Sequence, residues 1–253
     1  MIVTFLGTGT SQGIPNIGCS CPVCLSLDFR DKRLRTSIHI KVKDKSFIID
    51  SGPDFRQQVL RERIDRLDAL IFTHEHKDHT AGLDDVRAFN FLQQKNMPVY
   101  GAPRVLKQIK QEFEYIFAEI KYPGVPLIDL HEINGEDFLI GGIKFTPINV
   151  MHYKLPVIGF RIDDFTYITD ANYISESELN KIRGSKTIVL NALQKTDHIS
   201  HFNLEQAVSL LTDLAPEKAY LIHISHRMGL HKEVEKELPE FIHLSYDGLK
   251  LTL

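Results

Sequence analysis

The sequence lacks tryptophan, has only three cysteines among 253 residues, and contains no run of about 18 apolar residues that could cross a bilayer. Its first residues carry neither a basic segment nor a long apolar one, so they do not resemble a secretory signal. We therefore expect a cytoplasmic protein with no membrane partner. Neither sign of charge dominates, because the sequence has 30 Lys and Arg against 33 Asp and Glu. The net charge of -3 supplies no positive field for long nucleic acids, so a nucleic-acid partner is not expected.

The three cysteines, Cys19, Cys21 and Cys24, stand close together in the sequence. An odd and crowded set is a poor disulfide framework, whereas thiolates at such spacings are typical metal ligands. The alternative is three reduced thiols at the surface.

Short β-rich runs alternate with helical patterns along the chain, and no linker or low-complexity tract interrupts them. We therefore expect one domain over residues 1–253. Strands are predicted at 2–6, 36–43, 46–50 and 68–72, helices at 81–94, 103–119, 175–183, 203–214 and 231–237, and hairpin turns at Asp44-Lys45, Gly141-Gly142, Asp163-Asp164 and Asp247-Gly248. Hairpins mixed with single helices argue against a purely parallel sheet. They favour an α/β fold in which two mixed sheets pack face to face with helices outside.

The segment Thr73–His79 is the most informative part of the sequence. Its four metal-competent side chains, His74, His76, Asp78 and His79, follow a predicted buried strand and precede a predicted helix. In extended backbone the first three share one face, and His79 joins them only if the chain turns there. A solvated polar loop is the alternative, but clustered imidazoles and carboxylates at a strand end favour a metal site.

The spacing His74-x-His76-x-Asp78-His79 resembles the HxHxDH signature of the metallo-β-lactamase superfamily. This resemblance implies an αβ/βα sandwich with two divalent metal ions in a cleft. It also implies three distant ligands, and the sequence offers His152, Asp170 and His223 at or near predicted strand ends. By resemblance, one ion takes His74, His76 and His152, the other takes Asp78, His79 and His223, and Asp170 bridges them.

Such a centre would suit a phosphodiester. Two divalent ions, two carboxylates and a bridging hydroxide leave a charge of about +1, which matches a monoanionic substrate. The hydroxide between the metals would attack phosphorus, so no Ser or Cys nucleophile is required.

His201 precedes a predicted helix for which Asn203 is a candidate N-cap. It resembles the histidine before a helix in the phosphodiesterase branch of the superfamily. This likeness implies protonation of the leaving group or contact with the substrate phosphate. The alternative is a histidine that only bonds the loop, and His198 is assigned such a structural role. Asp78 and His201 are the predicted catalytic residues.

Three thiolates leave a tetrahedral structural zinc one ligand short. His226 is the candidate for the fourth, because it follows His223 by three residues. In extended backbone an odd separation directs two side chains to opposite sides, so one segment could serve two different metals.

Several motifs together narrow the resemblance. They are Gly7-Thr-Gly-Thr-Ser-x-Gly13-x-Pro15, the cysteine motif, Thr36-Ser37, and Asp50-Ser-Gly52-Pro-Asp54-Phe-Arg56. This combination resembles the PhnP-type phosphodiesterases, which open 5-phosphoribosyl 1,2-cyclic phosphate. The resemblance implies a cyclic or linear phosphodiester substrate, manganese or zinc at the dinuclear site, a separate zinc on the cysteines, and often a homodimer. Arg35 and Arg56 are candidate contacts for a second substrate phosphate, although an ion-paired or solvated arginine is the usual alternative.

The leading hypothesis is a metal-dependent phosphoric diester hydrolase for a small-molecule, cyclic phosphodiester. One alternative is an endoribonuclease of the tRNA 3'-processing type, although the basic arm usual in that branch has no counterpart in this sequence. A second is a non-hydrolytic protein of cofactor biosynthesis resembling pyrroloquinoline quinone protein B, which shares this kind of cysteine motif. Thioester or lactam hydrolysis is also open to a metal-bound hydroxide.

Overall fold

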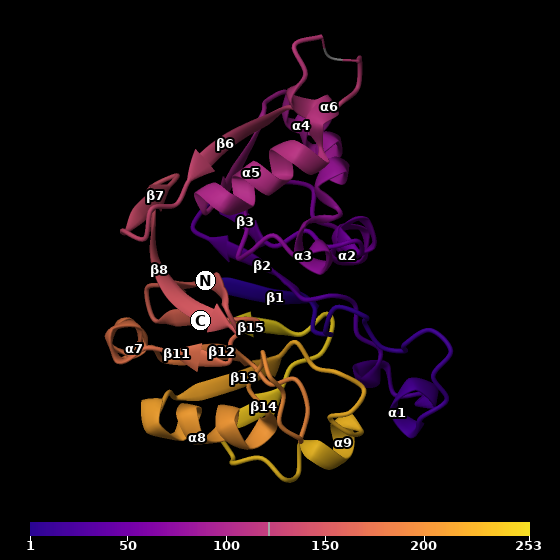
Figure 1. Cartoon of the computed structure of the whole chain (residues 1–253), viewed down its shortest axis with the longest axis vertical. Helices are drawn as coiled ribbons and strands as arrows, with labels where there is room; N and C mark the ends of the chain where they lie inside the picture. Colours follow the sequence, from indigo (N-terminus) through magenta and orange to yellow (C-terminus); the bar gives the residue numbers. More distant parts are fainter. Residues whose placement is uncertain (121) are drawn as a thin grey trace.

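The computed structural model describes residues 1–120 and 122–253, which form two β-sheets packed face to face with helices on both outer faces (Figure 1). In spatial order, the first sheet holds β15 (Lys250–Thr252), β1 (Ile2–Gly7), β2 (Ser37–Val42), β3 (Lys45–Ile49), β4 (Ala69–Ile71), β5 (Met97–Gly101) and β6 (Ile128–Glu132). The second holds β11 (Tyr173–Ile174), β8 (Ile143–His152), β9 (Leu155–Ile162), β10 (Phe165–Tyr167), β12 (Thr187–Asn191), β13 (Lys218–Ile222) and β14 (Ile242–Leu244), and β7 (Phe138–Ile140) pairs with β8.

Each sheet combines antiparallel and parallel neighbours. In the first, β1, β2 and β3 are antiparallel while β3 to β6 are parallel. In the second, β8, β9 and β10 are antiparallel while β10, β12, β13 and β14 are parallel. The predicted fold class, an α/β sandwich of two mixed sheets, is confirmed. One domain over 1–253 stays a prediction.

The helices cover the outer face of each sheet. Over the first sheet lie α2 (Phe55–Glu62), α4 (Arg87–Gln93), α5 (Pro103–Glu112) and α6 (Glu114–Phe117); over the second lie α7 (Glu176–Ile182), α8 (Leu204–Leu214) and α9 (His231–Val234). The central core lies between the sheets, where Phe5 and Phe47 of the first meet Phe145 and Phe160 of the second. Among the described residues, no helix combines the length and apolarity needed to cross a membrane.

Two of the predicted long helices are divided in the structure. The helix expected at 81–94 is divided into α3 (Lys77–Thr80), a 3₁₀ turn (Leu83–Val86) and α4. The break comes at Gly82, whose N–H donates to the Ser51 carbonyl and whose backbone leaves no room for a Cβ beside Gly52. The helix expected at 103–119 is likewise divided into α5 and α6.

The hairpin predicted at Asp247-Gly248 is wrong. β14 belongs to the second sheet and β15 to the first, so the chain crosses between sheets at this point. The Asp247 carboxylate anchors the crossing, because it accepts hydrogen bonds from the Thr8 N–H, the Thr8 hydroxyl and the Leu34 N–H. The turn expected at Asp44-Lys45 falls one residue earlier, since Val42 pairs with Lys45.

Candidate metal centre and substrate cleft

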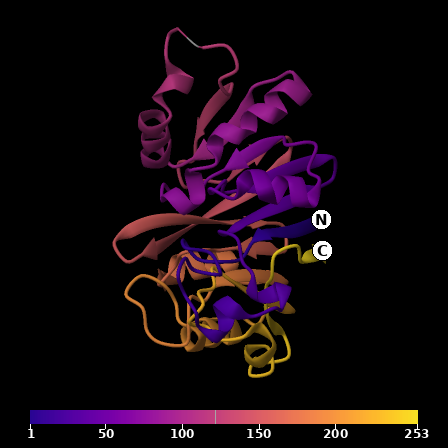
Figure 2. The ribbon, with the colours of Figure 1, turned by 90° about the vertical axis from the view of Figure 1, so that its right-hand side faces the viewer.

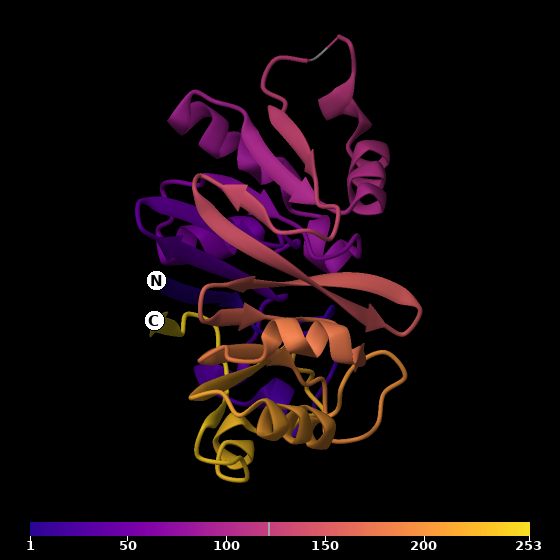
Figure 3. The same ribbon diagram turned by 90° about the vertical axis from the view of Figure 1, so that its left-hand side faces the viewer.

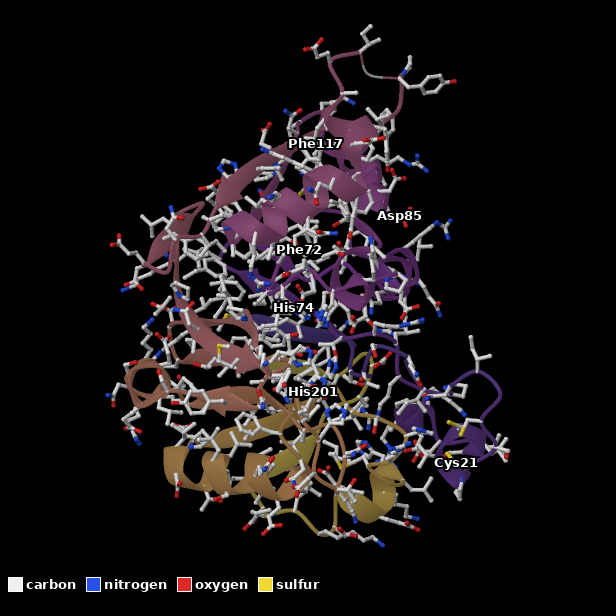
Figure 4. The ribbon with its side chains drawn as sticks, viewed as in Figure 1. Cys21, Phe72, His74, Asp85, Phe117 and His201 are labelled. Atoms are coloured by element: carbon white, nitrogen blue, oxygen red, sulfur yellow. The ribbon has the colours of Figure 1, made fainter. Side chains whose placement is uncertain are left out.

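The candidate ligands come from strand ends of both halves of the molecule, and Figure 4 shows His74 and His201 near its middle. Asp50 directly follows β3 and His223 directly follows β13, while Asp170 lies three residues after β10. All three have left-handed backbone, with φ of 66°, 58° and 56°. This conformation is uncommon for residues with a Cβ and concentrates at functional sites. Here it turns the chain where each side chain must enter the centre.

The segment after β4 makes the turn that His79 requires. His76 is the N-cap of the short helix α3, which carries Asp78 and His79. As a result, the rings of His74 and His79 have centroids 4.2 Å apart, and those of His74 and His76 are 4.7 Å apart. His74 and His79 are buried and His76 is exposed.

Asp50 supports these ligands from behind, and the sequence reasoning gave it no role. Its carboxylate accepts hydrogen bonds from the Thr73 N–H and hydroxyl and from Nδ1–H of His79. Because the Thr73 hydroxyl donates to Asp50, it accepts from Nδ1–H of His74 at 2.9 Å. In both imidazoles Nδ1 is used by these bonds, which leaves Nε2 as the nitrogen that can bind a metal, as in metal-binding histidines. The available signal was an aspartate directly after a buried strand.

The second half of the molecule supplies the remaining groups. Nδ1–H of His152 donates to the Ser200 carbonyl at 2.8 Å, so its Nε2 is also free. Asp170 places Oδ2 3.3 Å from Nε2 of His79 and 3.2 Å from Nδ1 of His223. The Thr10 and Thr36 hydroxyls each lie 3.2 Å from a His223 ring nitrogen.

Three overlapping groups have ligand atoms within 4.8 Å of one another: Asp78, His79 and His223; His74, His79 and Asp170; and His152, Asp170 and His201. The first is the trio assigned to one ion from the sequence. His76 belongs to none of the three groups, but its ring lies beside His152, with centroids 5.2 Å apart.

The carboxylates in this cluster favour a bound cation. Burial alone would lower the pKa of His79, but Asp78, Asp170 and Asp50 raise it well above its usual value. Burial would raise the pKa of Asp78, but His79 holds it below its usual range. Two carboxylates thus converge on one imidazole nitrogen, Nε2 of His79, with Oδ2 of Asp78 at 3.2 Å. Nε2 of His74 is buried without a hydrogen-bond partner among the described residues. This donor set fits divalent metal ions.

His201 lies beside His152, His223 and Asp170 in the cluster. Its ring centroid is 4.5 Å from that of His152 and 4.9 Å from that of His223, and its Nδ1 is 3.9 Å from the Asp170 carboxylate. Burial, with a contribution from His223, lowers the pKa of His201 to about 3, so the imidazole is neutral at pH 7. The predicted N-cap Asn203 is confirmed, because it forms a capping box with Gln206 at the start of α8.

The cysteine segment, with α1 (Pro22–Leu25), lies beside the C-terminal half (Figure 2). Nδ1 of His226 is 3.3 Å from Cys19 Sγ, 3.4 Å from Cys21 Sγ and 3.6 Å from Cys24 Sγ. The Cys24 N–H lowers the pKa of Cys21 to about 6, whereas burial raises the pKa of Cys24 to about 11. Three sulfurs and one imidazole at these separations suit a tetrahedral zinc.

The two arginines have different surroundings. Arg35 pairs with the Asp54 carboxylate at 3.1 Å and donates to the Ser11 carbonyl, and it lines a hollow with Gln12. Arg56 is exposed on α2 and makes no ion pair with another described residue. Their contact with substrate stays a prediction.

Comparison with known proteins gives the following likenesses. The family model "Beta-lactamase superfamily domain" matches residues 45–224. An octanoyltransferase of Porphyromonas gingivalis is 39% identical over 249 residues, which are 97% of this chain but 50% of that protein. The chain thus spans about half the length of this relative.

Two solved structures are similar over the whole chain. A diphosphatase from the PhnP family is 37% identical, with a TM-score of 0.93 over 100% of this chain and 97% of that one. Zn²⁺-bound PqqB from Methylobacterium extorquens is 18% identical, with a TM-score of 0.79 over 100% of both chains, and this likeness concerns the fold. The family match covers well over half of the sequence, and the likeness to the PhnP-family diphosphatase agrees with the cysteine and HxHxDH motifs. The chain belongs to the metallo-β-lactamase superfamily.

Proposed function

We propose that this protein is a dinuclear metal-dependent phosphodiesterase that hydrolyses a small, cyclic phosphodiester. The observation that carries the proposal is the convergence of two carboxylates and several imidazoles with fixed tautomers on one cleft. His74, His76 and His152 would hold one ion, Asp78, His79 and His223 the other, and Asp170 both. The 37% identity to a diphosphatase of the PhnP family supports hydrolysis at a phosphoryl group.

When bound, the two ions supply an activated water molecule and positive charge next to the phosphoryl oxygens. Asp78 and Asp170 reduce the positive charge of the centre, which favours a substrate with one negative charge over a dianion. Hydrolysis forms a bond between the water oxygen and phosphorus and breaks one phosphorus–oxygen ester bond. The departing oxygen must then receive a proton.

His201 would deliver that proton. Burial lowers the pKa of this imidazole more than the Asp170 carboxylate raises it, which favours the neutral ring. An anionic phosphate next to the ring adds the negative charge that favours the imidazolium. An imidazolium formed in this way would pass its proton to the leaving oxygen.

The cysteine site would hold a structural zinc outside the reaction. Its four ligands complete a tetrahedral set, whereas a catalytic zinc keeps one position open. Such an ion would fix the segment that leads from Thr10, next to His223, to Arg35.

Removing the metals and adding them back tests the proposed phosphodiesterase activity. Protein stripped with a chelator should lose turnover of a 2',3'-cyclic ribose phosphate and of bis(p-nitrophenyl) phosphate, and manganese or zinc should restore it. Elemental analysis should find about three ions per chain in the active protein, two for catalysis and one on the cysteines. One tightly held zinc with no turnover under any metal would overturn the proposal and favour the cofactor-biosynthesis alternative.

Two further substrates test the competing activities. A precursor tRNA tests the 3'-processing alternative, and an octanoyl thioester tests the chemistry suggested by the name of the Porphyromonas gingivalis relative. Preferred cleavage of either one over the cyclic diester would replace the proposed substrate class.

Comparing turnover of diesters with different leaving groups tests the role of His201. His201→Ala should reduce turnover of a diester with an alkoxide leaving group about 100-fold, because that oxygen needs a proton. With p-nitrophenolate as leaving group the loss should be only a few-fold, since this anion departs unprotonated. His198→Ala, which alters the exposed neighbouring imidazole, is the matched control. Equal losses with both leaving groups would exclude the acid role.

A further inference from the structure

A hollow with a volume of about 420 Å³ opens directly next to the metal centre. It is lined by His76, His152, Tyr153, Lys154, Leu155, Ile199 and Ser200. Apart from His76, two segments line it: the tip of the long β8–β9 hairpin, which projects to one side in Figure 3, and the loop that precedes His201. The hollow therefore shares His76 and His152 with the site where the phosphate would react.

The hairpin tip holds Tyr153 in a strained conformation. His152 pairs with Leu155, so Tyr153 and Lys154 form a two-residue turn. Tyr153 has φ of 57°, which glycine or asparagine would adopt at lower energetic cost. A bulky aromatic residue that persists in such a position is an indication of function.

Asn172 fixes both walls of the hollow relative to each other. Its Oδ1 accepts a hydrogen bond from the Tyr153 N–H at 2.8 Å, and its Nδ2 donates to the Ile199 carbonyl at 3.0 Å. Nδ1–H of His152 makes a second link to the loop through the Ser200 carbonyl. The walls are thus positioned by the residues that also position the metal centre.

Two apolar side chains of these walls are open to solvent. Tyr153 is 51% exposed and Ile199 is 66% exposed. The Lys154 ammonium lies 5.3 Å from the centroid of the Tyr153 ring and forms no ion pair with a carboxylate among the described residues. An aromatic ring, an aliphatic wall and an unpaired cation together match a flat heteroaromatic group attached to a phosphate.

We propose that this hollow binds the nucleobase of the substrate, with Tyr153 stacking on the base while the phosphodiester lies at the metals. The inference rests on the proposed function and makes it more specific, because it assigns the substrate class to nucleoside phosphodiesters rather than sugar phosphodiesters. Tyr153 is then a specificity-determining residue, and Asn172 positions it.

Two substrates with the same reacting group test the inference: adenosine 2',3'-cyclic phosphate and methyl riboside 2,3-cyclic phosphate. The wild-type protein should have a kcat/KM about 10-fold or more higher for the adenosine compound, in line with the strength of base–aromatic stacking. Tyr153→Ala should remove most of this preference and leave the riboside value within about 2-fold. Tyr153→Phe should retain the preference, since the ring remains.

The outcomes separate the two proposals. Turnover of neither substrate by the wild-type protein would contradict the phosphodiesterase function itself. Turnover of both, with a preference that Tyr153→Ala leaves unchanged, would contradict the nucleobase site alone. Calorimetric binding of adenosine 5'-monophosphate to the metal-loaded protein gives a second readout, and Tyr153→Ala should weaken it about 10-fold. Tyr122→Ala, another exposed tyrosine outside this hollow, should change none of these values.

Discussion

Asp170→Asn should abolish most phosphodiester turnover, with a loss of kcat of about 1000-fold or more. Asp170 is buried, and its ligand atom groups with those of His74 and His79 and with those of His152 and His201. Among the candidate ligands, only Asp170 and His79 belong to two of these groups. Asparagine keeps the shape of the side chain but removes the negative charge that the two proposed ions would share. Metal analysis should therefore find fewer than two cleft ions per chain, while the zinc on the cysteines remains.

Asp164→Asn is the matched control for this change. Asp164 lies in the turn between β9 and β10, where it is about half exposed and pairs with Lys186. Its replacement should leave turnover and metal content unchanged. Full activity and full metal content in Asp170→Asn would exclude a bridging role and require a different ligand arrangement.

Gly52→Ala should disrupt the centre without altering any ligand. A Cβ at residue 52 would lie 2.0 Å from the backbone carbonyl oxygen of Asp78, so α3 must move away. Overpacking against backbone costs about 1–3 kcal/mol of unfolding free energy. Because α3 carries Asp78 and His79, the same shift should lower cleft metal content and reduce turnover about 100-fold. Thermal unfolding, metal analysis and kinetics check the three effects.

Gly101→Ala separates this effect from the general cost of replacing a glycine. There the nearest atom to an added Cβ is the Leu106 Cδ2, at 3.2 Å, at the end of a flexible side chain that can move. This variant should retain its metals and turnover. Normal metal binding in Gly52→Ala would show that α3 tolerates displacement and that the close approach has no role in placing the ligands.

Local patterns predicted the features that depend on local backbone. The strand before His74 and the turn that returns His79 follow from a buried apolar run and a change of period. The odd separation of His223 and His226 predicted that their side chains point to two different sites. The two side chains do lie in different clusters. These inferences succeeded because each used only the geometry of a few consecutive residues.

Features that depend on distant partners could not be predicted in this way. Asp247 and Gly248 have the residue types of a tight turn, but the partners of the Asp247 carboxylate are Thr8 and Leu34, more than 200 positions away. The tip of the β8–β9 hairpin was overlooked for the opposite reason, because Tyr153 and Lys154 are poor turn formers. Asn172 compensates for that strain from another strand end. The position of Asp50 after a buried strand did not reveal its role, because that role depends on Thr73 and His79.

The turn after β13 places His223 in the cleft and His226 beside the cysteines. Between them, Ile224 exchanges backbone hydrogen bonds with Thr8 and Thr10, and the Ser225 N–H donates to the Leu193 carbonyl, so the turn is anchored to two other segments. In the metal-loaded protein, an ion at either end would restrict this turn and reduce the entropy lost when the other end is occupied. The two affinities would then be thermodynamically linked, and reciprocity would require the same factor in both directions: zinc on the cysteines would strengthen metal binding in the cleft as much as cleft metals would strengthen zinc binding.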